Sequence, residues 1–131
     1  YPVADSACDS PSQLASEQMP ILTRQAMRWF WRQYLPEGAS GLDPRASLLR
    51  QSALQGLPAA TVITAEVDPL RDEGEAYEQA LVKAGVCVTQ RRWLGQFHGF
   101  ASLLGTLDAA NQVLFFAAGQ LRQAFAQKVE K

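Results

Sequence analysis

The sequence predicts an α/β fold in which parallel strands are joined by a crossover helix. A β-branched, apolar run at residues 61 to 67 has the length of a strand, and a second strand is predicted at residues 86 to 92. Between them, a helical stretch begins at Pro69 and closes at Gly85, the positions where helix starts and ends favour proline and glycine. Strand, helix and strand within about 30 residues are typical of a parallel crossover unit.

The N-terminal part predicts a loop followed by one helix. Residues 4 to 20 are rich in Ser, Asp, Gln and Pro and show no apolar period, so we expect a surface loop. From residue 22 to residue 35, apolar and aromatic residues recur at helical spacing, which predicts an amphipathic helix with an aromatic face. Pro36 and Gly38 end this helix, and a short segment follows at residues 47 to 54.

The two strands differ in their predicted surroundings. The strand at residues 61 to 67 is apolar on both faces, so we expect it to be buried and to have neighbours on both edges. The strand at residues 86 to 92 mixes polar and apolar side chains, which favours the edge of a sheet. A final helix, from about residue 107 to residue 127, carries an apolar stripe. Because two strands are too few for such a sheet, and Tyr1 is not an initiator Met, we expect an additional N-terminal portion.

Composition excludes several classes of partner. The 131 residues are 47% hydrophobic and 19% charged, which is ordinary for one globular domain. With 12 basic and 13 acidic side chains the formal net charge is -1, so we expect no nucleic-acid partner. The apolar runs are far shorter than the roughly 20 residues that cross a bilayer, so we expect no membrane span.

Cysteine and histidine usage argues against a metal. Cys8 and Cys87 form no C-x-x-C pair, and the sequence has one histidine. We therefore expect two free thiols, no metal and no cofactor. Free thiols and the absence of a visible export signal favour the bacterial cytoplasm.

An acid and the single histidine follow the two predicted strands. Ligands of open α/β sheets gather beyond the carboxyl ends of the strands, and these ends carry Asp68 and the segment Gln96-Phe97-His98-Gly99. A carboxylate that orients an imidazole through its Nδ1 proton supplies two members of a Ser-His-Asp triad. We therefore expect Asp68 to orient His98, and His98 to act as general base and then general acid.

Structural interpretations of the same residues remain open at this point. An aspartate before a proline is often a turn former or helix cap, and a lone histidine is often structural. Asp72 and Glu73 fall in the first turn of the predicted helix, where acids interact favourably with the macrodipole, so we interpret both as structural. Arg71 is expected to pair with them or with the additional N-terminal portion.

The third triad member is not found in the sequence. Neither a nucleophile elbow G-x-S-x-G nor a glycine-rich HGGG segment for an oxyanion hole occurs. Gly38-Ala39-Ser40-Gly41 comes nearest and has the wrong spacing. We therefore expect the nucleophilic serine upstream of Tyr1.

The residues around these motifs resemble one family closely. The run L-P-A-A-T-V-I-T-A-E-V-D-P-L-R-D-E-G at residues 57 to 74, followed by A-G-V at residues 84 to 86 and H-G-F at residues 98 to 100, resembles bacterial esterases and lipases of the hormone-sensitive-lipase-like α/β-hydrolase group. Upstream, residues 1 to 3 resemble the end of the family's strand after the nucleophile helix. The stretch at residues 27 to 35 resembles its cap helix.

One loop departs from the family pattern. Asp43-Pro44-Arg45-Ala46-Ser47 resembles the loop after the cap helix, but Leu48 stands where family members often have proline.

The resemblance implies a serine carboxylester hydrolase without a cofactor, acting on a small ester of modest acyl length. It implies that residues 1 to 131 are the C-terminal fragment of a single α/β-hydrolase domain, with residues 12 to 45 contributing to a cap. Asp68 and His98 would be its triad acid and base. The aromatic face of the cap helix is typical of packing, and one or two of its rings would contact the substrate. The candidates are Trp29, Phe30 and Tyr34, together with Phe100 of the H-G-F motif.

Rival hypotheses differ in class. Without the serine we expect the isolated chain to be inactive, with the N-terminal half as its partner. The alternative is a non-catalytic α/β module that associates with a separate N-terminal half or with itself. Haloalkane or epoxide chemistry would need an aspartate nucleophile, and the D-P-L-R-D-E-G motif favours the esterase branch.

Overall fold

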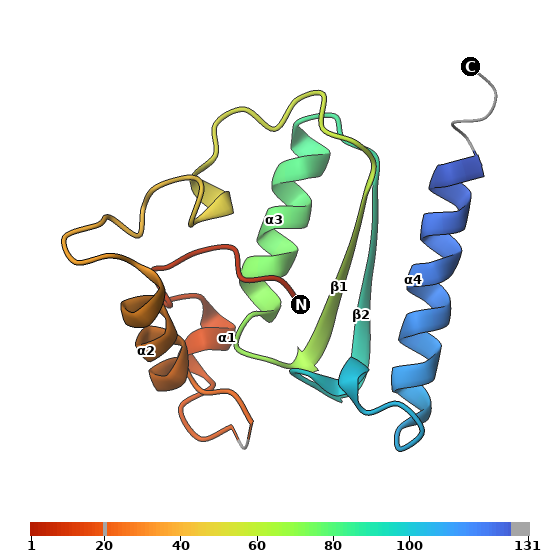
Figure 1. Cartoon of the computed structure of the whole chain (residues 1–131), viewed down its shortest axis with the longest axis horizontal. Coiled ribbons are helices and arrows are strands. Elements are labelled where there is room, and N and C mark those ends of the chain that lie inside the picture. Colours follow the sequence, from red (N-terminus) through yellow and green to blue (C-terminus); the bar gives the residue numbers. More distant parts are fainter. Residues whose placement is uncertain (20, 127–131) are drawn as a thin grey trace. The chain divides into compact units, whose positions relative to one another are not determined.

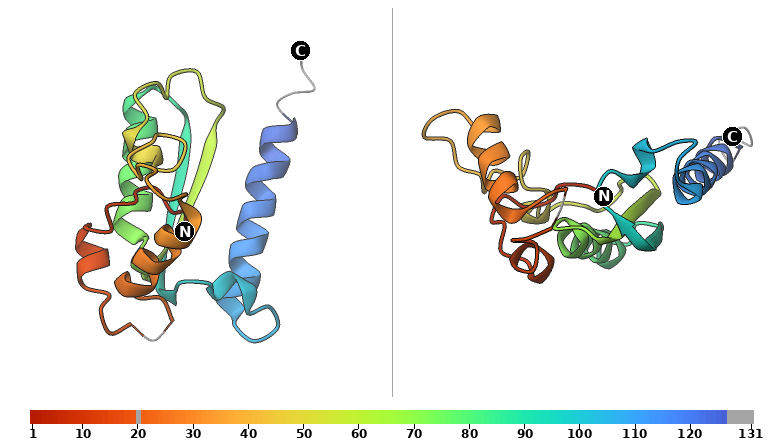
Figure 2. Two further views of the ribbon diagram at one scale, coloured as in Figure 1. Left: turned by 60° about the vertical axis from the view of Figure 1, so that its left-hand side comes forward. Right: turned by 90° about the horizontal axis from the view of Figure 1, so that it is seen from below.

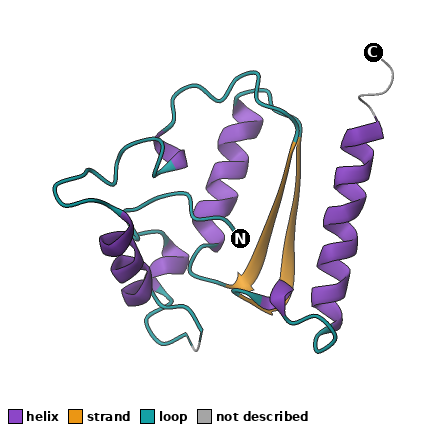
Figure 3. Ribbon diagram, viewed as in Figure 1, coloured by secondary structure: helices purple, strands orange, loops and turns teal. Residues whose placement is uncertain are grey.

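The computed structural model describes residues 1–19 and 21–126 and divides into two compact units, Tyr1–His98 and Gly99–Lys131. Figures 1 and 3 show a strand, helix and strand preceded by shorter helices in the first unit, and one long helix in the second. The elements are α1 (Pro11–Leu14), α2 (Arg24–Tyr34), the 3-10 helix η1 (Leu48–Arg50), β1 (Ala60–Val67), α3 (Arg71–Lys83), β2 (Val88–Phe97), the 3-10 helix η2 (Phe100–Ser102) and α4 (Asp108–Ala126).

Strands β1 and β2 pair in parallel, which confirms the predicted crossover unit. Their register runs from Ala60 opposite Val88 to Val67 opposite Phe97. Helix α3 packs against the strand pair, as the two views of Figure 2 also show. An apolar cluster between α3 and β1 includes Val62 and Leu81, so the crossover buries its own core.

The end of α3 decides where β2 starts. Gly85 has a φ of 81°, its N–H donates to the carbonyl of Val82 at 2.9 Å, and the N–H of Val86 donates to that of Leu81 at 3.0 Å. This is a Schellman motif, which satisfies the last carbonyls of the helix. The N–H of Val86 is therefore used to close α3. The predicted strand start at residue 86 is wrong, and β2 begins at Val88.

The predicted end of the second strand at residue 92 is also wrong. Pairing continues to Phe97 through an irregularity, since Ala65 lies opposite Trp93 but Val67 lies opposite Phe97. Gly95, with a φ of 70°, lies inside this bulge. A β-bulge lets a strand continue past residues that cannot pair regularly. The pattern of apolar and polar side chains in the sequence does not indicate where such a bulge lies.

The surroundings of β1 differ from the expectation. Thr61 is exposed and Val67 keeps 40% exposure, so the expected burial of both faces fails at the ends of the strand. Within the described residues β1 forms a ladder with β2 alone. On its other edge, the amino group of Tyr1 donates to the carbonyl of Ile63.

The N-terminal segment is more ordered than the predicted loop. Ser10 caps α1 by accepting from the N–H of Gln13, and Pro11 occupies the first helical position. Serine followed by proline is a helix-start signal. The loop was predicted in spite of it, because residues 4 to 20 show no apolar period. Cys8, expected in a polar loop, is buried in a cluster with Met27 and Trp31 of α2, whereas Cys87 is exposed; both thiols are free.

Helices α2 and α4 follow their predicted spans closely. Thr23 caps α2 by accepting from the N–H of Ala26 at 3.1 Å, and the helix ends at Tyr34. Helix α4 ends at Ala126, and the predicted end at residue 127 lies outside the described residues. In residues 1–19 and 21–126, no helix combines the length and apolarity needed to cross a membrane.

Replacing Gly85 tests the Schellman motif. We expect Gly85→Ala to lower the free energy of unfolding by about 1 kcal/mol, because an alanine pays a steric cost at positive φ. Gly85→Asn should lose less, since asparagine tolerates the left-handed region. Urea unfolding of the three proteins measures this order, and equal stability of the alanine variant and wild type would contradict it.

Candidate active site

The paired strands place Asp68 and His98 at the same end of the sheet. Each follows the last paired residue of its strand, since Val67 lies opposite Phe97. Neighbouring strands lie about 4.8 Å apart, so side chains just beyond such a pair are within reach of each other. The bulge in β2 is what brings His98, rather than an earlier residue, to this position. The N–H of Gly95 in the bulge donates to the carboxylate of Glu66 at 2.6 Å, which ties it to β1.

The carboxylate of Asp68 is fully buried and hydrogen-bonded at both oxygens. Oδ2 lies 2.9 Å from Nδ1 of His98, and Oδ1 accepts from the N–H of Leu70 at 2.8 Å. A buried carboxylate is costly unless it is paired, and these two donors satisfy it. The turn-forming role considered for Asp68 and its pairing with His98 therefore coexist, one on each oxygen.

His98 is partly exposed and held on one side of its ring. Its side chain is 26% exposed, and the ring of Tyr1 packs against it with centroids 4.7 Å apart. With Nδ1 facing Asp68, Nε2 lies on the opposite side of the imidazole. Gly99 follows with a φ of 84°, a conformation that favours glycine, so the chain turns immediately after the histidine.

The acids that follow Asp68 bind the N-terminal segment. Glu73 is buried and accepts from the N–H of Ala4 at 2.8 Å and from Nε2 of Gln13 at 3.2 Å. Burial raises the pKa of Glu73 above its ordinary value, against the lowering effect of these hydrogen bonds. Arg71 pairs with Asp72 at 2.8 Å and also donates to the carbonyl of Glu66. Asp72 and Glu73 therefore accept hydrogen bonds from the N-terminal segment, in addition to their interaction with the helix dipole.

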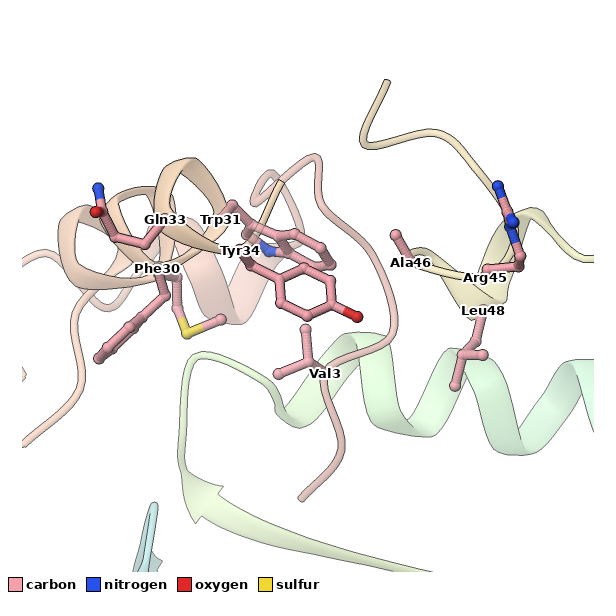
Figure 4. Close-up of a pocket in the computed structure, with 9 residues that line it drawn as sticks. Val3, Phe30, Trp31, Gln33, Tyr34, Arg45, Ala46 and Leu48 are labelled. Carbon is pink, nitrogen blue, oxygen red and sulfur yellow. The ribbon is translucent and has the colours of Figure 1, made fainter. Parts of the chain in front are cut away.

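A cavity of about 570 Å³ lies in the first unit, between α2, the N-terminal segment and the residues around η1 (Figure 4). Its lining is mostly apolar. Arg45 is the charged lining residue, and its guanidinium binds Asp43 and lowers the pKa of that carboxyl to about 2. The lining residues are Val3, Met27, Phe30, Trp31, Gln33, Tyr34, Arg45, Ala46 and Leu48.

The backbone connects this cavity to the histidine. Val3 lines the cavity and Tyr1 packs against His98. Two residues of chain span at most about 7 Å, so the backbone of Tyr1, whose ring contacts His98, lies within that distance of the backbone of Val3.

The four aromatic candidates are distributed differently. Phe30 and Tyr34 line the cavity. Trp29 is half-exposed, is absent from the lining, and packs edge-on against Phe30 with centroids 5.2 Å apart. Phe100 belongs to η2 of the second unit and is fully buried. Contact of any of the four with a substrate stays a prediction.

Several residues of this region were not anticipated from the sequence. Val3, Ala46 and Leu48 reach the cavity from separate segments, and no local pattern in the sequence marks them. Trp31 belongs to the predicted aromatic face, and its spacing of four from Met27 signals the buried side of α2. In the part of the chain that the structure describes, no group of three or more His, Cys, Asp or Glu side chains is arranged to hold a metal ion.

Residues 1–102 match the family described as the alpha/beta hydrolase fold. The chain belongs to this family, and the predicted fold class is confirmed.

Proteins similar to this chain carry esterase names. An ethyl acetate hydrolase of Pseudomonas putida is 35% identical over 123 residues, covering 94% of this chain and 39% of the relative. The carboxylic ester hydrolase LipN of Mycobacterium tuberculosis is 40% identical, covering 87% of this chain and 32% of the relative.

Two similar solved structures also carry esterase names. The ester-hydrolase EH1AB1 from the metagenome of Lake Arreo superposes with a TM-score of 0.90 at 39% identity, covering 96% of this chain and 40% of that one. A bacterial heroin esterase gives a TM-score of 0.85 at 32% identity, covering 92% and 39%. The chain thus spans less than half the length of these proteins.

Glu73 should make stability pH-dependent with a defined sign. Because its folded-state pKa is raised, its contribution to stability is present below the ordinary value of 4.5 and is lost as pH rises through the raised value. Glu73→Gln removes this titration, and its amide can donate to Oε1 of Gln13, a buried atom without a hydrogen-bond partner among the described residues.

We expect the free energy of unfolding of wild type minus that of Glu73→Gln to fall as pH rises from 4 toward 8. Chemical denaturation at several pH values measures it. Glu78→Gln, at a partly buried position of the same helix, is the control for removing a carboxylate from α3. A difference that is flat or rises with pH would contradict the assignment.

Proposed function

We propose that the protein is a serine carboxylester hydrolase in which Asp68 and His98 are the triad acid and base. The supporting observation is the 2.9 Å contact between Oδ2 of the buried Asp68 and Nδ1 of His98 at the carboxyl ends of paired parallel strands. Relatives named as ester hydrolases support the reaction class.

The geometry assigns each nitrogen of His98 a role. The carboxylate of Asp68 accepts a hydrogen bond from Nδ1–H and so holds the imidazole in the tautomer whose Nε2 is unprotonated. Nε2 then removes the hydroxyl proton of a serine as that oxygen attacks the ester carbonyl. The same proton returns to the departing alcohol, which leaves an acyl-enzyme. A water molecule, deprotonated by Nε2, releases the acid and regenerates the serine.

We place the serine and the oxyanion donors on a part of the protein outside these 131 residues. The sequence has no G-x-S-x-G, and the chain spans about 40% of its relatives. On this proposal the chain alone is inactive toward esters and an N-terminal portion completes the sheet along the second edge of β1. Residues 12 to 45 contribute to a cap over the site.

The cavity beside α2 is proposed as the acyl site. Its mostly apolar lining, and the pairing of Arg45 with Asp43, fit an uncharged acyl group of modest length. Phe30 and Tyr34 are the proposed aromatic contacts, whereas Trp29 and Phe100 would act through neighbouring residues.

A second candidate function rests on the exposed strand edge. Within the described residues β1 forms a strand ladder on one edge only, while Tyr1 contacts the carbonyl of Ile63 on the other, and an edge without a partner strand is a template for association. A non-catalytic module that associates with a separate N-terminal half or with itself would use that edge.

The first experiment measures hydrolysis of a short-chain nitrophenyl ester by this chain, alone and mixed with the polypeptide encoded upstream. We expect turnover in the mixture only. His98→Ala should abolish it, and Asp68→Asn should lower kcat by about 10⁴-fold because the imidazole loses its tautomer. Asp9→Asn, an exposed carboxylate elsewhere, is the control and should keep full activity.

The outcomes separate the two candidates. Turnover that survives His98→Ala would contradict the triad. Binding of the two polypeptides without turnover favours the non-catalytic module, and light scattering of the chain alone tests its self-association.

The acyl site is tested in the same active mixture. Ala46→Phe should fill the cavity and lower kcat/KM for a hexanoyl ester by about 10- to 100-fold relative to an acetyl ester, as expected for several methylene groups losing their pocket. Arg32→Ala, on an exposed position of α2 outside the lining, should leave this ratio unchanged. An unchanged ratio in Ala46→Phe would place the acyl group elsewhere.

A further inference from the structure

Helix α3 starts directly after the acid of the proposed triad, and it has no cap of its own. Leu70 occupies the capping position and supplies no side-chain hydrogen bond. The first N–H groups of a helix have no acceptor within the helix, so they need acceptors from outside it. At the start of α3 the N–H of Asp72, and the carbonyl of Pro69 in the preceding turn, find their partner in another segment.

Ser12, distant in sequence, fills this role. Its hydroxyl donates to the carbonyl of Pro69 at 2.7 Å and accepts from the N–H of Asp72 at 3.1 Å. Its own N–H donates to Oδ2 of Asp72 at 2.7 Å. The side chain is 1% exposed, so one buried serine bridges both ends of the turn that follows Asp68.

Helix α1 holds this serine in place. Ser10 caps α1, its hydroxyl lies 3.3 Å from that of Ser12, and α1 packs against α3. Gln13, the next residue, donates to the buried carboxylate of Glu73. The unpredicted short helix is thus attached to the start of α3 through two adjacent residues.

We propose that Ser12 is a positioning residue for the Asp68–His98 pair, acting as a helix cap supplied from outside α3. The catalytic importance of this role rests on the proposed function. The effect of Ser12 on the Asp68–His98 pair is itself measurable without any ester. Loss of the hydroxyl leaves the carbonyl of the buried Pro69 and the part-buried N–H of Asp72 without this partner. The turn then shifts so that these groups reach water. This shift moves the carboxylate of Asp68 away from Nδ1 of His98.

The single histidine makes the effect directly observable. In ¹⁵N-labelled chain, long-range proton–nitrogen spectra report the His98 tautomer, and solvent exchange reports the strength of the Nδ1–H bond. We expect Ser12→Ala to raise the exchange rate of Nδ1–H by about tenfold and to populate the other tautomer. Ser12→Thr, which keeps the hydroxyl, should restore the wild-type spectrum.

Ser16→Ala is the matched control. Its hydroxyl is equally buried in the same segment and donates to the carbonyl of Gln13 at 2.7 Å, but it does not touch the turn after Asp68. We expect Ser16→Ala to leave the His98 signals unchanged at a similar loss of stability. Asp72→Ala removes the partner of the Ser12 N–H from the other side and should shift His98 in the same direction, which provides a second variant if Ser12→Ala does not fold.

Two results would overturn the proposal. One is a wild-type Nδ1–H exchange rate in both Ser12→Ala and Asp72→Ala, and the other is an equal change in Ser16→Ala. Failure of the esterase proposal would instead appear as absent turnover in the mixture with the His98 tautomer intact.

Discussion

The burial of one carboxylate is the constraint on which the rest of this structure depends. Asp68 has no exposed surface, and an ion of this size removed from water costs several kcal/mol unless donors replace the solvent. The donors come from two places: the N–H of Leu70 in its own turn, and Nδ1 of His98 at the end of the next strand. The strand register, the bulge and the turn must therefore together place both donors at the carboxylate of Asp68, because any shift of β2 removes the second donor.

The turn after β1 is fixed from three directions by residues distant in sequence. Leu70 is buried in the apolar cluster with Met27 and Trp31, which anchors the turn to α2. Ser12 bridges the carbonyl of Pro69 and the start of α3, and Glu73 holds the backbone of Ala4. Such a turn resists deformation because moving it breaks apolar packing and charge-assisted hydrogen bonds together. A rigid carboxylate at Nδ1 favours the imidazole tautomer that carries its proton on that nitrogen.

The same N-terminal segment contacts His98, the cavity and helix α3. Tyr1 packs against His98, Val3 lines the cavity, and the segment that follows binds α3. On the proposed function, the apolar cavity beside α2 would hold the acyl group of the ester on which His98 acts. The position of His98 and the lining of that cavity would then both depend on one short stretch of backbone.

Patterns that the chain carries locally were readable from the sequence, and contacts between distant segments were not. The β-branched run of β1, the apolar period of α2 and the stops at Pro36 and Gly85 predicted the α/β class and the parallel crossover, since periodicity and glycine conformation act within a few residues. The proximity of Asp68 and His98 was predicted because strand ends of a parallel sheet meet at one edge. The bulge that extends β2 to Phe97, the burial of Cys8, the short helix around Ser12 and the cavity residue Leu48 depended on tertiary structure. Their partners lie tens of residues away, and a buried polar residue such as Ser12 has the composition of a loop until the group that it binds is known.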